Sequence, residues 1–331
     1  MKKKILYVNN YGANYSTFER IKIGEYSRSH MWGIYELFNS HSDEIELITS
    51  PNLQKINFRL LRLLRTFSFQ IKLFFKYRST PVIYAGAAHL IDIFALMKKM
   101  KIYHGKLFVV IHHPTKSPYL AMYDRIITIS EYTHKYLEQK GCKNTKLLFW
   151  GPDLNFYNTN SFEVVNEKTI DFYSNGKSFR DFDILRNLDL PYDITILANK
   201  DFVPSNLNIK ILEHVDAIKN VQLCKQSKIM LIPISKNVRG ICGLTSVIDG
   251  LGGGMPLLIS DNSNIGLDIE KQDIGFVYKA GDKEDLKRKM KEILIPENYN
   301  RMKSNVKSFA ENNDYNKFAM EIKILLENEV N

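Results

Sequence analysis

The regular alternation of short apolar runs with amphipathic stretches is the feature that most constrains the fold of this chain. Short apolar runs suit buried strands, and helical periodicity between them is typical of βα units around a parallel sheet. In the first half of the chain we expect strands at 4–9, 45–49, 81–85, 106–111 and 125–129, and helices at 30–40, 54–78, 88–101 and 131–140.

A polar stretch divides this pattern into two series. After Trp150-Gly151-Pro152 the chain is polar through about residue 168, and we interpret this stretch as a linker. The alternation then restarts, with strands expected at 169–174, 193–198, 228–233, 256–259 and 275–278, and helices at 180–187, 218–226, 245–253, 283–294, 298–311 and 313–329.

The length of 331 residues agrees with two domains, at about 150 residues for each. We predict a Rossmann-like domain over 1–152 and a second one over 168–311. The helical residues 312–331 are expected to pack back on the first domain. Doubly wound sheets bind ligands beyond the carboxyl ends of their strands, so two such domains facing each other across a cleft would give each of two substrates its own wall.

Composition and charge narrow the class of partner. Hydrophobic residues at 44% and charged residues at 25% are typical of a globular protein and exclude disorder. The formal charge of +10 favours an anionic partner, which can be a nucleic acid, a phosphate-bearing small molecule or an anionic membrane.

The setting expected from the sequence is a reducing cytoplasm. Cys142, Cys224 and Cys242 are isolated and odd in number, which argues against a disulfide framework. The apolar run after Lys4 is too short for a signal peptide, and no apolar run of about 18 residues predicts a membrane span.

Two loops of the first domain could contact a ligand. Gly12 follows the first strand and allows close backbone approach, although no GxGxxG dinucleotide fingerprint is present and a plain turn is the alternative. His112 and His113 follow the strand at 106–111, where imidazole can donate to a sugar hydroxyl or take up a proton. A zinc pair is disfavoured because adjacent side chains on a strand point in opposite directions.

In the second domain, the turn Asn175–Asp181 ends a strand and precedes a helix. Gly176, Lys177 and Arg180 would bring backbone amides and two cations together, which suits a diphosphate. Asp181 and Asp183 form a DxD pair that could hold a metal, but acids in the first turn of a helix are also favoured by its dipole.

The loop from Pro233 to Ser260 is the most informative segment. It includes Lys236 and a Gly-rich turn, and a helix opens at Leu244, Thr245 and Ser246, whose free N–H groups can cradle a phosphate. Asp249 lies one turn further on and could reach sugar hydroxyls, or could simply interact with the helix dipole.

This loop resembles the nucleotide-sugar signature of GT-B glycosyltransferases, in particular family 4, the retaining "glycosyl transferases group 1". The turn at Gly176 and Lys177 is similar to the Gly-Lys/Arg turn of that family beside the donor diphosphate. The matching segments are Gly243-Leu244-Thr245-Ser246-Val247-Ile248-Asp249-Gly250 and Gly254-Met255-Pro256-Leu257-Leu258-Ile259, with Ile127-Thr128-Ile129-Ser130-Glu131-Tyr132 in the first domain.

The resemblance implies a GT-B fold and a metal-independent transfer of a hexose from a nucleotide-sugar substrate, UDP favoured over GDP, without a cofactor. The family usually pairs two glutamates with seven residues between them; here Asp249 replaces the second, and Ile241 occupies the place of the first. The residues expected to bind the donor are Gly12, Asn175, Gly176, Lys177, Arg180, Lys236, Gly243, Leu244, Thr245, Ser246 and Asp249, and those expected in catalysis are His112, His113 and Asp249.

Residues 54–78 carry seven basic side chains and no acid among many leucines and phenylalanines. Such a basic amphipathic helix predicts contact with an anionic membrane from the cytoplasmic side, and the alternative is a helix that covers the first sheet with its cations in water. No nucleic-acid-binding motif accompanies the charge. Membrane contact would suit a glycan or lipid-linked acceptor in surface polysaccharide assembly. A non-catalytic subunit of the same fold and a sugar-nucleotide 2-epimerase remain alternatives.

Overall fold

The computed structural model describes two compact units. They are unit 1 (1–23, 28–149 and 315–331) and unit 2 (24–27 and 150–314). The residues described are 3–12, 14–51, 58–159, 168–186, 188, 190–198, 202–205, 207–238 and 240–329.

Unit 1 is built on a six-stranded parallel sheet in the order β2-β1-β3-β4-β5-β6. The central strands are almost wholly buried, as expected for a sheet that is covered on both faces. The chain winds from β1 outward to β2 and then returns to place β3 on the other side, so the winding direction reverses between β1 and β3. The strands are β1 (Ile5–Asn9), β2 (Ile45–Thr49), β3 (Val82–Ala85), β4 (Lys106–Ile111), β5 (Arg125–Thr128) and β6 (Thr145–Leu147).

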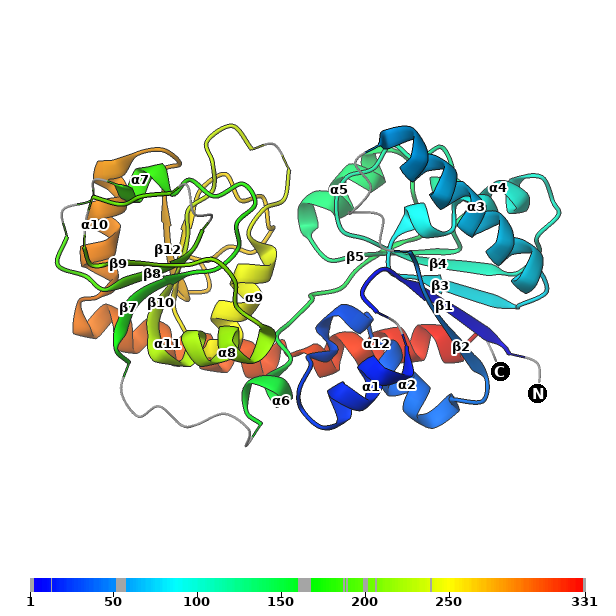
Figure 1. Cartoon of the computed structure of the whole chain (residues 1–331), viewed down its shortest axis with the longest axis horizontal. Coiled ribbons are helices and arrows are strands. Elements are labelled where there is room, and N and C mark those ends of the chain that lie inside the picture. Colours follow the sequence, from blue (N-terminus) through cyan, green and yellow to red (C-terminus); the bar gives the residue numbers. More distant parts are fainter. Residues whose placement is uncertain are drawn as a thin grey trace. The chain divides into compact units, whose positions relative to one another are not determined.

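Helices cover both faces of this sheet (Figure 1). One face packs against α3 and α4 through Leu73, Phe74 and Phe94, and the other packs against the segment before α2 and against α12. On that second face the Tyr84 hydroxyl donates to the carbonyl of Trp32 at 2.6 Å. The α-helices are α1 (Tyr15–Lys22), α2 (Ile34–His41), α3 (Arg59–Tyr77), α4 (Asp92–Lys99), α5 (Glu131–Gln139) and α12 (Tyr315–Glu327), with 3-10 turns at Arg28–Met31, Ala88–Leu90 and Leu120–Met122.

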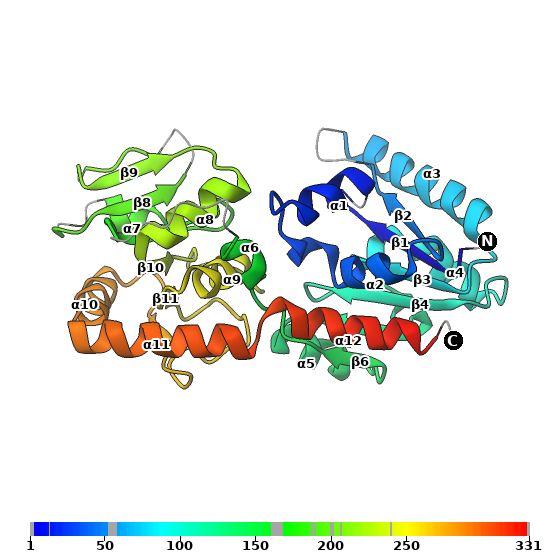
Figure 2. The ribbon, with the colours of Figure 1, turned by 90° about the horizontal axis from the view of Figure 1, so that it is seen from below.

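Helix α12 approaches α2 closely at one glycine. Gly33 caps α2 in the left-handed region at φ 80°, and its N–H donates to the Tyr315 hydroxyl at 2.7 Å. A Cβ at Gly33 would lie 2.7 Å from Cβ of Ile322, so the two helices touch at this point (Figure 2).

We expect Gly33→Ala to lower the free energy of unfolding by about 2–4 kcal/mol, because left-handed strain adds to overpacking. Gly141→Ala is the matched control, since Gly141 has φ +82° but nothing within 4 Å of its Cβ position. Urea unfolding of the two variants separates the strain from the clash. Equal losses in both would show that Ile322 does not set the cost at Gly33.

Unit 2 has a second six-stranded parallel sheet, in the order β12-β11-β10-β7-β8-β9. The chain winds from β7 outward to β9 and then returns to place β10 beside β7, so the direction of winding reverses between β7 and β10. The strands are β7 (Ile170–Ser174), β8 (Ile194–Leu197), β9 (Ile209–Leu212), β10 (Ser227–Ile232), β11 (Leu257–Ser260) and β12 (Gly275–Tyr278).

The helices of unit 2 also form two layers. Leu286, Met290 and Met302 pack on one face of the sheet, and α8 and α9 lie against the other. The helices are α6 (Leu154–Tyr157), α7 (Asp183–Arg186), α8 (Ala217–Gln226), α9 (Leu244–Gly253), α10 (Lys283–Ile293) and α11 (Pro296–Asn312).

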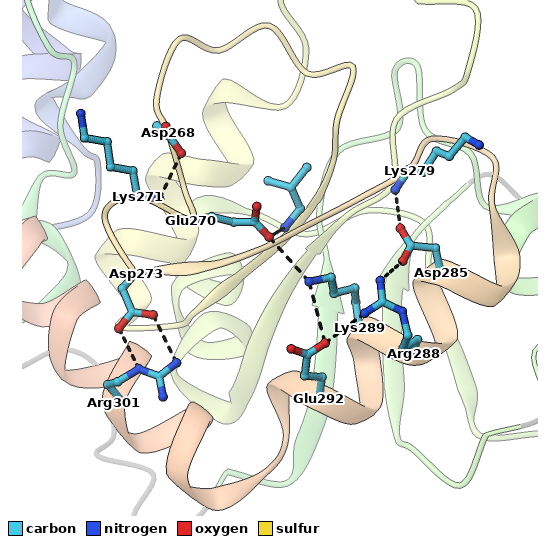
Figure 3. A network of polar contacts seen from close by, with 11 residues as sticks. Asp268, Glu270, Lys271, Asp273, Lys279, Asp285, Arg288, Lys289, Glu292 and Arg301 are labelled. Carbon is cyan, nitrogen blue, oxygen red and sulfur yellow. Dashed lines mark hydrogen bonds and ion pairs between the residues drawn. The ribbon is translucent and has the colours of Figure 1, made fainter.

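Many cations of α10 and α11 are already paired with acids. Arg288 pairs with Asp285, Lys289 lies 3.6 Å from Glu270, and Arg301 pairs with Asp273 at 2.8 Å (Figure 3). These charges therefore belong to a solvated ion-pair network. Because they are paired, they are poor candidates for binding an anionic ligand.

Several sequence predictions of local structure were incomplete. The helix expected at 180–187 is a single turn at Asp183–Arg186, and α1, β6 and β9 were not predicted. The strands β6 and β9 are short sheet edges with partly exposed residues, so they lack a continuous apolar run. The predicted linker was wrong over 154–157, because α6 buries Phe156 and Tyr157 against Val221. Its residues 160–167 lie outside the described part of the chain.

No helix among the described residues combines the length and the apolar character that crossing a bilayer requires. All three cysteines are buried and free.

Candidate functional site

The candidate site of unit 2 lies where β7 and β10 end side by side. Doubly wound sheets bind ligands at the point where the winding direction reverses, because the loops there diverge to opposite faces. The two loops are joined to each other, since Asp181 N donates to the Pro233 carbonyl and Ser235 N to the Phe179 carbonyl, both at 2.9 Å. We call the Ser174–Arg180 turn together with Gly243–Asp249 the switch-point site.

Helix α9 begins at this site on a bare glycine cap. Gly243 has φ 87°, and no side chain caps the helix, so its first N–H groups at Leu244, Thr245 and Ser246 point outward without a side-chain acceptor. A Cβ at Gly243 would lie 2.8 Å from Cγ2 of Ile232, so only glycine lets the helix start this close to the end of β10.

Arg180 lies beside that helix start. Its Nη2 donates to Ser246 Oγ at 2.7 Å, and its Nη1 donates to the Ser178 carbonyl at 3.2 Å. Gly176 makes this possible, because a Cβ there would lie 2.8 Å from Nη2. Nη1 also donates to Cys242 Sγ at 3.4 Å, no carboxylate of the described residues forms an ion pair with Arg180, and its Nε is buried without a hydrogen-bond partner. Burial lowers the pKa of this guanidinium, and no carboxylate in the described part of the chain balances its charge.

A buried polar network supports the turn from below. Asn175 Nδ2 donates to Asp249 at 2.5 Å and to Asn220 at 3.2 Å, while the Tyr157 hydroxyl donates to the other oxygen of Asp249. Burial raises the pKa of the Asp249 carboxyl, and the hydrogen bonds from Tyr157, Asn220 and Asn175 partly oppose this shift. Oδ1 of Asn175 is buried with no partner in the described structure. Both oxygens of Asp249 thus hold the turn in place, and its predicted contact with a sugar stays a prediction.

The other predicted donor-site residues lie around this centre. The side chains of Lys177, Lys236 and Thr245 are exposed, and no contact in the described structure brings Lys177 to Arg180. Lys236 lies against Gly281, whose added Cβ would be 3.1 Å from Lys236 Cδ. Ile241 is buried at 8% exposure, as an apolar residue in the place of an expected acid.

The DxD pair has ordinary structural partners. Asp181 accepts from the N–H of Ile184 at 3.3 Å, and Asp183 pairs with Arg186 at 2.7 Å. Across the described residues, no group of three or more His, Cys, Asp or Glu side chains is placed to hold a metal ion.

The remaining predicted residues belong to unit 1. His112 follows β4, and its ring lies 4.4 Å from the Trp32 ring, centroid to centroid. Burial lowers the pKa of His112 to about 4, helped by the neighbouring charges of His113 and His30. His113 is more exposed than His112, and partial desolvation of its ring lowers its pKa as well. Gly12 turns at φ +65° just before α1, with the reversal point of β1 and β3 at the same sheet edge.

Sequence reasoning missed Tyr157, Tyr173 and Asn220. Tyr173 donates to Asn220 at 2.9 Å and so extends the network under Asn175. The signal for Tyr157 in the sequence was the pair Phe156-Tyr157 inside a polar stretch, because two adjacent large aromatic residues indicate a buried segment and not a solvated linker.

Comparison with solved structures identifies the fold. A glycosyltransferase from Rickettsia africae matches with a TM-score of 0.67 at 11% identity, covering 99% of each chain. HepE from Anabaena, solved with UDP, matches with a TM-score of 0.67 at 14% identity over 98% of this chain and 100% of its own. A protein from Listeria monocytogenes described as a UDP-N-acetylglucosamine 2-epimerase matches at 0.61 and 11% identity, covering 97% and 95%.

These likenesses confirm the predicted fold class: the chain has the GT-B fold, with two Rossmann-like parallel-sheet domains. No protein-family model and no curated protein sequence matches the chain.

Proposed function

We propose that this chain is a metal-independent glycosyltransferase that takes a hexose from a nucleotide-diphosphate sugar, UDP favoured over GDP. The observation that carries this proposal is Arg180, a partly buried cation with no carboxylate partner among the described residues, beside the uncapped start of α9. Two negative charges of a diphosphate would supply the missing anion and accept from the free N–H groups. HepE, which shares the fold, has been solved with UDP and with UDP-glucose.

The proposed chemistry is electrostatic. As the bond between sugar and diphosphate breaks, negative charge grows on the leaving phosphate, and fixed donors that need no reorganisation stabilise it best. Arg180, Ser246 and the α9 amides would provide them, with Lys177 and Lys236 as exposed cations at the rim. The acceptor is proposed to be a glycan or lipid-linked sugar held by unit 1 near Gly12, His112 and His113, and the transfer to retain the anomeric configuration.

Isothermal titration provides the test. UDP should bind at least about 100-fold more tightly than uridine, because each charge-assisted hydrogen bond to the diphosphate contributes about 1.5–3 kcal/mol. UDP-glucose and GDP, titrated with and without EDTA, then rank the donors and check metal independence. Equal affinity for uridine and UDP would contradict the proposal, because the phosphates would then contribute nothing.

Two alternatives have observations of their own. The likeness to an epimerase favours a sugar-nucleotide 2-epimerase, which would convert UDP-N-acetylglucosamine with no acceptor present. The buried Ile241 favours a non-catalytic binding subunit, which would bind donor but never turn it over. Product analysis with donor alone, and then with an acceptor mixture, distinguishes all three.

A further inference from the structure

Helix α3 of unit 1 presents three stripes of different chemistry along its length. One stripe faces the core: Leu73 and Phe74 are buried at 5% exposure, and buried Gln70 accepts from the N–H of Ile93 at 2.8 Å. This stripe begins only at Phe69, since residues 60–65, 67 and 68 are all exposed. Packing against the sheet therefore explains the apolar side chains in the second half of α3, but not those in its first half.

A second stripe is apolar and faces outward. Leu60, Leu64, Phe67 and Phe75 are exposed at 69%, 57%, 54% and 65%. At about 100° per residue they fall on one side of the helix, roughly a quarter turn from the core-facing stripe and about 22 Å long. Seven of the twenty exposed large apolar side chains among the described residues lie between Phe58 and Phe75. Such a concentration marks a surface that is covered by a partner.

The third stripe is basic. Arg65, Lys72 and Lys76 are exposed and share the remaining side of the helix with Arg62. The sequence between 51 and 78 contains no acid. The apolar and basic stripes together form the outer half of α3, which is the outer layer over the first sheet in Figure 1.

We propose that the outer half of α3 binds the surface of an anionic membrane. The apolar stripe would lie among the acyl chains just below the headgroups, and the basic stripe would contact lipid phosphates. A second copy of the chain fits less well, because two basic stripes would be brought together. A nucleic acid would neutralise the cations but leave the leucines and phenylalanines in water.

The experiment is co-sedimentation of the full chain with vesicles of phosphatidylcholine alone or with 30 mol% phosphatidylglycerol, on the order of a plasma-membrane charge. We expect binding to the anionic vesicles only. Arg65→Gln with Lys72→Gln should weaken it about 25-fold, at about fivefold for each cation. Lys303→Gln with Lys307→Gln is the matched control, since both lysines are exposed on α11 and the loss of net charge is the same.

Phe67→Ser with Phe75→Ser tests the apolar stripe and should reduce binding while the urea unfolding transition is kept, because both side chains are exposed. Equal binding of the α3 and α11 charge variants would overturn the proposal. So would a concentration-dependent dimer in light scattering that the phenylalanine variant abolishes, because the stripe would then be a subunit interface. Neither readout uses a nucleotide, so its outcome is independent of the proposed enzyme activity.

Discussion

Replacing Arg180 by alanine is expected to lower the affinity for UDP by about 100-fold or more, a loss of about 3 kcal/mol. The guanidinium already lies beside Ser246 with its Nε unpartnered, so the favourable contact is made only when an anion arrives. Titration calorimetry with UDP measures the loss. Arg180→Lys should restore part of it, because lysine keeps the charge but not the planar fork.

The stability of the ligand-free Arg180→Ala variant distinguishes a binding role from a structural role, because removal of a structural arginine would lower the free energy of unfolding. Removing a partly buried cation that has no carboxylate partner among the described residues leaves no orphaned charge behind, so we expect little loss of unfolding free energy. Arg186→Ala is the control: this partly exposed arginine lies six residues after Arg180, pairs with Asp183 and should leave UDP affinity unchanged. A large loss of stability with unchanged UDP affinity would assign Arg180 to the fold.

Acidification should destabilise unit 1 strongly between about pH 6.5 and pH 4. His112 and His30 each have a pKa lowered to about 4 by burial, against 6.5 for a free histidine. Between these values the unfolded chain binds more protons than the folded one, so stability is full above pH 6.5 and is lost as the pH falls toward 4. The loss is about 3 kcal/mol for each histidine.

Trp32 provides a local reporter for this transition, because its ring touches that of His112. Urea titrations followed by tryptophan fluorescence in a Trp150→Phe background would give the stability of unit 1 at each pH. His112→Phe should flatten the pH dependence by about half, whereas His104→Gln, at an exposed histidine, should not change it. A pH dependence that is equal in all variants would show that buried histidines do not cause it.

The sequence was sufficient for five of the six strands of each sheet and for the Gly243–Ser246 helix start, because these depend on local patterns, whereas the edge strands β6 and β9 were missed. Arg180 was also identified, but its contact with Ser246 depends on two loops that are far apart in sequence and meet only when β7 and β10 pair. Asn220 could not be found in this way: it lies in mid-helix on α8, and only the fold brings it under Asn175. Tyr157 was missed because the stretch after Pro152 was interpreted as one polar linker, although the adjacent aromatics Phe156 and Tyr157 indicate burial.

The return of α12 to unit 1 also bears on how the chain folds during synthesis. Unit 1 needs Phe318 against Trp32 and Tyr315 against Gly33, yet these two α12 residues leave the ribosome after the whole of 150–314. Domains usually mature in the order in which they are made. Here the last part of unit 1 to be synthesised is a core helix, so unit 2 should reach its native state first, and unit 1 should wait for the final residues with the face around Trp32 uncovered.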